Sequence, residues 1–157
     1  MNLVHLAFYD IILKIKSSLI GGMHMLYELI EKDFGEKENY NCAEKILYGA
    51  NKAYNLGLDK DALKLSAAFG GGMGIESICG ALTGAVMAIS SKYVENIAHE
   101  DKEIKNLTKQ LFKRYEDEMG SIRCDELKAK YKKEDIGCKY VILRAAKILD
   151  TIVEENM

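Results

Sequence analysis

The stretch that spans residues 69–89 constrains the fold more than any other part of the sequence. It begins with a run in which four of five positions are glycine: Gly70, Gly71, Gly72 and Gly74. Because glycine has no Cβ, such a run favours left-handed turns and a close approach of the backbone to another group. The run therefore predicts a glycine-rich loop rather than ordinary helix or strand.

The residues after this loop predict a closely packed central helix. Ser77 offers a hydroxyl that is expected to cap a helix over residues 78–97. On that helix Gly80, Gly84 and Ala88 recur every fourth residue and form one face of small side chains. Another backbone can pack closely against such a face, which alone is also typical of an ordinary core helix.

The composition favours a single all-α domain. The chain has 157 residues, enough for one domain with a sizeable core, and 48% of them are hydrophobic and 29% charged. It contains no proline, and its β-branched residues do not alternate in the manner of strands. We therefore expect a single-domain helical bundle with the glycine-rich loop before the central helix.

Local signals place the other helices. Asn41 and Glu44 have the form of a capping box and predict a helix that buries Cys42 and ends near residue 57. Asp59 is expected to cap a short helix that ends at residue 69. Further helices are predicted over 100–119, where Gly120 ends the helix, over 122–131 with Ser121 as cap, and after Asp135.

The amino-terminal segment is treated as a separate part of the chain. We expect residues 1–25 to be an apolar helical extension and residues 26–157 to be the four-cysteine helical domain. The extension is apolar on more than one side, which predicts a contact within the domain or with a second copy of the chain. We expect a homodimer, although Met23 and Met25 are alternative starts that would remove this segment.

Charge and hydropathy exclude several classes of partner. The formal net charge is −2, which gives no general electrostatic basis for binding nucleic acid or an anionic membrane. No uncharged apolar stretch approaches the roughly 18 residues that a membrane-spanning helix needs. No secretory signal is evident, and four cysteines are too few for a secreted disulfide scaffold of this length. A cytoplasmic, reducing location is expected.

The four cysteines are the strongest chemical signal. Cys42, Cys79, Cys124 and Cys138 each fall in the first turn of a predicted helix. Helix amino termini carry partial positive charge and unpaired N–H groups, which favour thiolate over thiol. A thiolate attacks disulfides and binds metals, so we expect the four sulfurs to gather in one site.

Spacing leaves the kind of site open. The cysteines are separated by 37, 45 and 14 positions, with no CxxC pair. Metal modules usually supply ligands in close pairs, which makes the local metal signal weak, but ligands on separate helices can converge in a bundle. A buried cysteine is also often just a small apolar side chain.

Other candidate groups are weaker. His5, His24 and His99 have no partners at ligand or triad spacing. The glycine run could cradle a phosphate, but no Lys-Ser/Thr pair follows it and no parallel strands are predicted. Glu76 lies near Cys79 in the sequence and is a candidate proton relay, or simply an acid at a helix amino terminus.

The sequence resembles a known family in these same residues. Cys79-Gly-Ala-Leu-Thr-Gly84, after the glycine run, looks like the hallmark of the C_GCAxxG_C_C family, whose members are described as redox-active. The family's other three characteristic cysteines resemble Cys42, Cys124 and Cys138. The resemblance covers roughly residues 26–156. The segment 75–78 departs from the family's more polar or glycine-containing approach to the cysteine.

The resemblance implies a redox or metal role and names no substrate. One alternative is an oxidoreductase in which the four cysteines perform thiol–disulfide or electron-transfer chemistry with a redox partner protein or a small-molecule electron donor. An alternative is that the same cysteines bind an iron–sulfur cluster or zinc. The glycines expected to shape a cofactor site are Gly70, Gly71, Gly72, Gly74, Gly80 and Gly84. A helical interaction module with inert cysteines is the alternative from another class.

Overall fold

A computed structural model of the protein describes residues 25–157. Within these residues the chain forms seven α-helices and no strand, with two isolated β-bridges. The prediction of an all-α single domain is therefore confirmed. The predictions for residues 1–24, including the apolar extension and its role in a dimer, lie outside the described residues.

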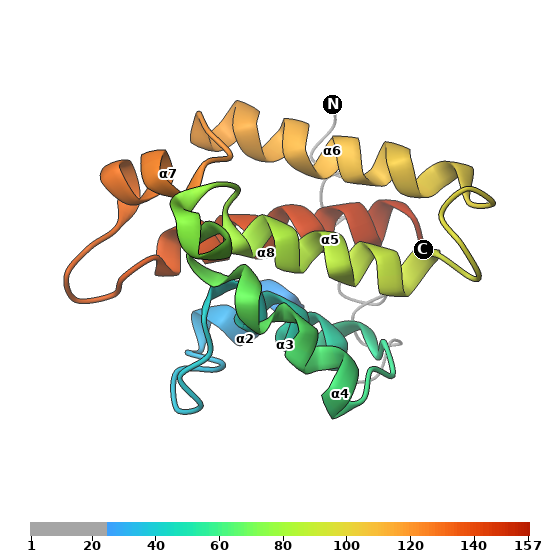
Figure 1. Ribbon diagram of the computed structural model, residues 1–157, viewed down its shortest axis with the longest axis horizontal. Coiled ribbons are helices and arrows are strands. Elements are labelled where there is room, and N and C mark those ends of the chain that lie inside the picture. The colour runs from blue at the N-terminus through green and yellow to red at the C-terminus, as the bar shows by residue number, and fades with distance from the viewer. Residues whose placement is uncertain (1–24) are drawn as a thin grey trace, which may run out of the picture.

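The helices stack in three layers, as Figure 1 shows. Helix α6 forms one outer layer, α5 and α8 form the middle, and α2, α3 and α4 form the other side, with α7 at one end. Their bounds are α2 Leu26–Glu31, α3 Cys42–Tyr54, α4 Lys60–Leu63, α5 Gly80–Tyr93, α6 Lys102–Met119, α7 Cys124–Tyr131 and α8 Lys139–Glu155. A 3₁₀ helix over Lys64–Phe69 follows α4.

The small-residue face of α5 packs against α3. Gly80, Gly84 and Ala88 are all buried. A Cβ added to Gly84 would stand 2.6 Å from the carbonyl oxygen of Ala43 and 3.2 Å from its Cα, closer than real side chains approach. The two backbones therefore meet directly, as the every-fourth-residue pattern predicts, and α5 is held in a fixed position relative to α3.

Two helix caps agree with the sequence prediction. The side chain of Asn41 accepts hydrogen bonds from the N–H groups of Ala43 and Glu44, and Glu44 completes the capping box. Asp59 accepts from the N–H of Ala62 at 2.8 Å. Both signals are local, because the cap and the capped groups lie within one turn.

Three other predicted caps are wrong. The helices expected after Ser77, Ser121 and Asp135 instead have Cys79, Arg123 and Cys138 as their N-caps. The segments before α5 and α7 pair with each other through an antiparallel bridge, which keeps Ser77 and Ser121 outside the helices. A second bridge within residues 133–137 forms a turn that contains Asp135. Each helix therefore begins at or directly next to a cysteine.

Two further expectations are corrected by the structure. Cys42 is half-buried rather than buried, because the first turn of α3 opens toward a cavity. Helix α5 ends at Tyr93, four residues before the predicted end at Ile97, which is exposed. By contrast, Gly120 ends α6 with a φ of 83°, as expected.

A buried carboxylate fixes the start of α2. Asp150 of α8 is 1% exposed and accepts hydrogen bonds from the N–H groups of Leu26 and Tyr27, at 3.0 and 2.8 Å. The hydroxyl of Tyr54 donates to the same carboxylate at 2.6 Å. A residue of α8 thereby supplies the cap that α2 lacks in its own sequence, and it ties α2, α3 and α8 together.

No helix among residues 25–157 combines the length and the apolar character needed to cross a membrane.

Candidate redox site

The glycine-rich loop forms a left-handed turn before α5. Gly71, Gly72, Met73 and Gly74 have φ values of 61°, 59°, 63° and 72°. This region is open to glycine but costly for a side chain such as that of Met73. A Cβ on Gly72 would stand 2.6 Å from the amide nitrogen of Ser77 and 2.7 Å from Cβ of Cys124. The loop therefore lies directly against the start of α7.

The remaining glycines of the predicted site have different surroundings. Gly70 lies against the side chain of Asn41, and Gly80 against the sulfur of Cys42. Gly71 lines the cavity described below, and Gly74 has no other residue near its Cβ position. These glycines shape the protein around the cysteines, and their binding of a cofactor stays a prediction.

All four cysteines line one cavity of about 260 Å³, which we call the cysteine cavity. Cys42 and Cys124 are the first residues of α3 and α7, and Cys79 and Cys138 are the N-caps of α5 and α8. All four are free thiols. Four helix starts far apart in the sequence thus bring their thiols to the same hollow, as the cysteine pattern predicts.

Backbone hydrogen bonds hold two of these cysteines in register. The N–H of Cys79 donates to the carbonyl of Ile122 at 2.9 Å, and the N–H of Cys124 donates to the carbonyl of Ser77 at 2.5 Å. These bonds flank the bridge between Ile78 and residue 123. The starts of α5 and α7 are consequently fixed to each other independently of their side chains.

Burial raises the pKa of three of the thiols. Burial, followed by the nearby Cys42, raises the pKa of Cys79 to about 12. Burial also raises the pKa of Cys124 and of Cys138. The expected lowering by helix amino termini is therefore outweighed at these three positions, because desolvation disfavours the charged thiolate.

Cys42 is the electrostatic centre of the group. It is a cause of the raised pKa at Cys79, at Cys124 and at Cys138. Negative charge on the sulfur of Cys42 therefore disfavours the thiolate form of the other three cysteines, as expected of thiols that share a small cavity.

Two lysines that were not predicted from the sequence also line the cysteine cavity. Lys45 lies on α3 and pairs with Glu36, and Lys128 lies on α7 and pairs with Glu76 at 2.6 Å. Lys128 acts against burial by lowering the pKa of Cys124. Spacing could have identified both lysines, because residues three or four positions apart share a helix face.

A buried tyrosine contacts the set from α6. Tyr115 is 0% exposed, and its hydroxyl donates to the carbonyl of Val141 at 3.2 Å. Burial is the largest cause of the raised pKa of this tyrosine, and the nearby Cys79 is the second. In the sequence Tyr115 was one of several apolar positions of α6, with nothing local to indicate a cysteine partner.

The cysteine cavity does not present a ready site for a single metal ion. Among residues 25–157, no group of three or more His, Cys, Asp and Glu side chains is close enough to hold one. His99 is exposed between α5 and α6, and His5 and His24 lie outside the described residues. Zinc coordination by all four sulfurs would require them to move closer together.

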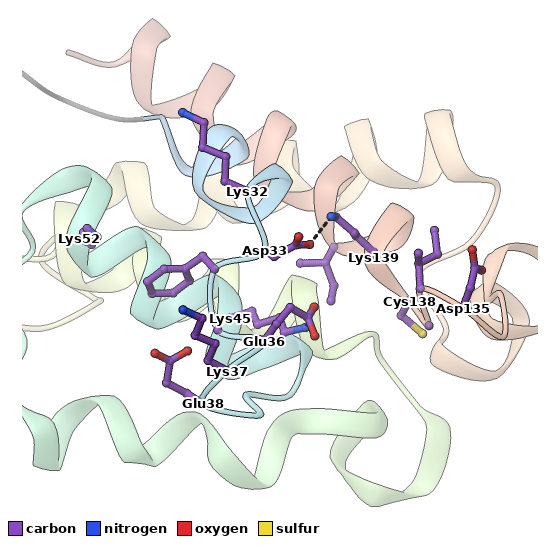
Figure 2. A pocket seen from close by; sticks show the side chains of 15 residues that line it. Lys32, Asp33, Glu36, Lys37, Glu38, Lys45, Lys52, Asp135, Cys138 and Lys139 are labelled. Atoms are coloured by element: carbon purple, nitrogen blue, oxygen red, sulfur yellow. Dashed lines mark hydrogen bonds and ion pairs between the residues drawn. The ribbon is translucent and has the colours of Figure 1, made fainter.

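A second and larger hollow of about 1040 Å³, which we call the side groove, opens beside the cysteine cavity (Figure 2). It is lined by residues 32–38, by Lys45 and Lys52 of α3, and by residues 135–139 with Ile142. The sulfur of Cys138 lies at one end of this groove in Figure 2, and Cys138 lines both hollows.

Comparison with known proteins agrees with this site. Residues 40–152 match the model of the C_GCAxxG_C_C family, described as "Putative redox-active protein". The matched region contains all four cysteines and the glycine-rich loop. No curated protein and no solved structure matches the chain.

Proposed function

Since the chain belongs to the C_GCAxxG_C_C family of redox-active proteins, we propose that it transfers electrons through Cys42, Cys79, Cys124 and Cys138. The observation that carries the proposal is the convergence of these four thiols on one cavity. Cysteines that only filled the core would have no reason to share a hollow, to begin four separate helices and to lie beside two lysines.

Thiol–disulfide exchange is the chemistry that we favour. In it a thiolate of the protein attacks one sulfur of the oxidising partner's disulfide, and the partner's other sulfur leaves as a thiolate that takes up a proton. A second cysteine then attacks the resulting mixed disulfide and releases the other half of the partner. The protein loses two electrons as two thiols become one disulfide, and the partner is reduced to two thiols.

The solvent exposure of the thiols indicates which cysteines react first with a partner's disulfide. Cys42 and Cys138 are half-buried, whereas Cys79 and Cys124 are buried, at 4% and 5% exposed. A partner's disulfide therefore meets the half-buried pair first. The pKa of Cys79, raised to about 12, keeps this thiol protonated at neutral pH and makes it a poor nucleophile.

An iron–sulfur cluster is the second candidate, because four thiols surround a cavity larger than one ion needs. An iron–sulfur cluster would supply one-electron chemistry, and the positive charge of its iron would keep its cysteine ligands deprotonated. Cys42, Cys79, Cys124 and Cys138 would hold it. Lys45 and Lys128 at the cavity would offset part of the negative charge of the thiolates.

Purification without oxygen tests the proposal. Iron, acid-labile sulfide, zinc and the visible spectrum are measured first, and free thiols are then counted before and after titration with oxidised dithiothreitol. Thiol exchange predicts the loss of two or four thiols at a defined potential without bound iron. Iron with sulfide and a visible band supports the second candidate. If the four thiols react no faster than ordinary buried cysteines, the alternative hypothesis of a helical interaction module with inert cysteines would be correct.

A further inference from the structure

Cys138 connects the cysteine cavity to the side groove. Within the described part of the chain it is the one cysteine of the four that lines both hollows. Lys45 and Ile142 are also shared, so the boundary between the hollows consists of these three side chains. A molecule that lies in the side groove can therefore reach a thiol of the redox site at Cys138.

The groove carries unneutralised positive charge. Two of its lysines are paired, Lys45 with Glu36 and Lys139 with Asp33. The groove's remaining charged side chains are three lysines and two carboxylates: Lys32, Lys37, Lys52, Glu38 and Asp135. Within residues 25–157, neither Lys32 nor Lys37 forms an ion pair. This local excess of positive charge contrasts with the net charge of −2 of the whole chain.

The groove also offers apolar surface and sufficient room. Phe34, Ile136 and Ile142 line it, and Nζ of Lys52 lies 5.9 Å from the centre of the Phe34 ring. Its volume of about 1040 Å³ is at the upper end of the range for small-molecule sites. Figure 2 shows Lys37 and Lys52 on the side opposite Cys138. A ligand with negative ends and a short carbon chain would meet both kinds of surface.

We propose that the side groove binds an anionic low-molecular-weight disulfide and presents it to Cys138. This inference rests on the proposed thiol–disulfide function. The thiolate of Cys138 attacks one sulfur of the ligand, the ligand's S–S bond breaks, and half of the ligand leaves as a thiolate that is protonated by water. Cys42 then attacks the sulfur of Cys138, a Cys42–Cys138 disulfide forms, and the second half of the ligand leaves as a thiol.

Three probe disulfides with similar carbon chains and different end charges test the groove. They are 3,3′-dithiodipropionate, which is anionic, 2-hydroxyethyl disulfide, which is neutral, and cystamine, which is cationic. The reduced full-length protein is mixed with each, quenched in acid at short times, and digested to locate mixed disulfides by mass spectrometry. A Cys42→Ser variant, in which the resolving thiol is missing, should accumulate the mixed disulfide at Cys138.

We expect Cys138 to react first, and several-fold faster with the anionic probe than with the cationic one at low ionic strength. Salt should reduce the difference, because exposed charges are screened over about 10 Å at 0.1 M. The triple variant Lys32→Gln, Lys37→Gln, Lys52→Gln should lose the preference for the anionic probe over the cationic one. A matched triple variant on α6, Lys102→Gln, Lys105→Gln, Lys109→Gln, should keep the preference.

The outcomes separate this inference from the function on which it rests. Equal rates with all three probes, first reaction at another cysteine, or equal effects of the two triple variants would overturn the groove assignment. If the neutral probe still oxidised the thiols in any of these cases, thiol exchange would stand. Absence of reaction with every probe would overturn both the groove assignment and thiol exchange. The relative rates and the first site of reaction are measured on the wild-type protein, so these two outcomes do not depend on the folding of a variant.

Discussion

The sulfur of Cys42 lies in the space that a side chain on Gly80 would occupy. Gly80 directly follows Cys79, so the absence of a side chain at this position lets α3 bring its cysteine against the start of α5. The carbonyl oxygen of Phe69 also lies near, 2.8 Å from where a Cβ would stand. The glycine of the Cys-Gly motif therefore serves the geometry of the thiols.

Replacing Gly80 by Ala should displace the sulfur of Cys42 and change its reactivity. The overpacking should lower the free energy of unfolding by about 1–3 kcal/mol. Urea denaturation measures the stability, and alkylation followed by mass spectrometry measures each thiol.

Gly84→Ala is the matched control for this change. It crowds the backbone of Ala43 one turn further along the same helix, at 2.6 Å from the carbonyl oxygen. We expect a similar loss of stability with little change in the alkylation rates of the four cysteines. If both variants altered the Cys42 rate equally, a special role of Gly80 would be wrong.

The raised pKa of Cys79 predicts a loss of stability in alkaline solution. Its ordinary pKa is 9.0, and burial raises it to about 12 in the folded chain. Below pH 9 both states hold the proton, so the group has no effect on the pH dependence. Between pH 9 and about 12 the unfolded chain releases the proton first, and stability falls by at most about 1.4 kcal/mol per pH unit.

Urea denaturation of the wild type and of Cys79→Ala at several pH values checks this prediction. The variant should show a shallower decline above pH 9, whatever its stability at neutral pH, because the proton of Cys79 is absent from both states. Parallel declines in the two proteins would contradict the pKa assignment.

Lys128 should set the reactivity of two cysteines. Its ammonium lowers the pKa of Cys124 and of Cys138, against the effect of burial. Lys128→Met should therefore raise both pKa values and slow alkylation of both thiols at pH 8 by several-fold. Lys130→Met is the control, because Lys130 lies over the ring of Tyr131, 4.9 Å from its centre, and should leave both rates unchanged.

Asp150 should contribute strongly to stability without acting in the redox chemistry. Asp150→Asn places an amide N–H₂ where the carboxylate accepts three hydrogen bonds, so buried donors lose their partners. We expect the free energy of unfolding to fall by about 1–3 kcal/mol. Tyr54→Phe should cost less, because two N–H donors remain. Thiol reactivity in the folded state should be unaltered in both, and a change there would contradict this assignment.

The homodimer and the division at residue 25 remain predictions. The apolar character of the first segment should support association, so the full-length chain should sediment as a dimer and a chain that starts at Met23 as a monomer. Sedimentation at several concentrations distinguishes the two. A monomer in both cases would rule out this interface.

Local signals in the sequence predicted local structure well. Asn41 with Glu44, the turn at Gly120 and the small face at Gly84 depend on neighbours within a turn or on one repeated contact. Each cysteine lies at or directly before the first residue of a helix, close to the predicted first turn, although Asn41 is the only one of the four predicted caps at these helices that the structure confirms. These signals were enough for the fold class and for the thiol set.

Features that depend on distant segments could not be predicted. Ser77 is a good capping residue, yet its carbonyl accepts from Cys124, 47 positions later, and the helix starts at Gly80. Likewise, Asp150 is an isolated carboxylate on an apolar stripe, and its partners come from α2 and α3. Contacts between residues this far apart do not follow from their spacing in the sequence and become visible only in the tertiary structure.

The distribution of the thiols along the chain orders the events of biosynthesis. Cys42 and Cys138 are separated by 96 positions, and Cys138 lies directly before α8. A ribosome-bound chain therefore exposes three thiols before their common cavity can close, and contacts so distant in sequence form late in folding. Closure of the cavity therefore waits for residue 138, and a chain that stops short of this residue carries at most three of the four thiols.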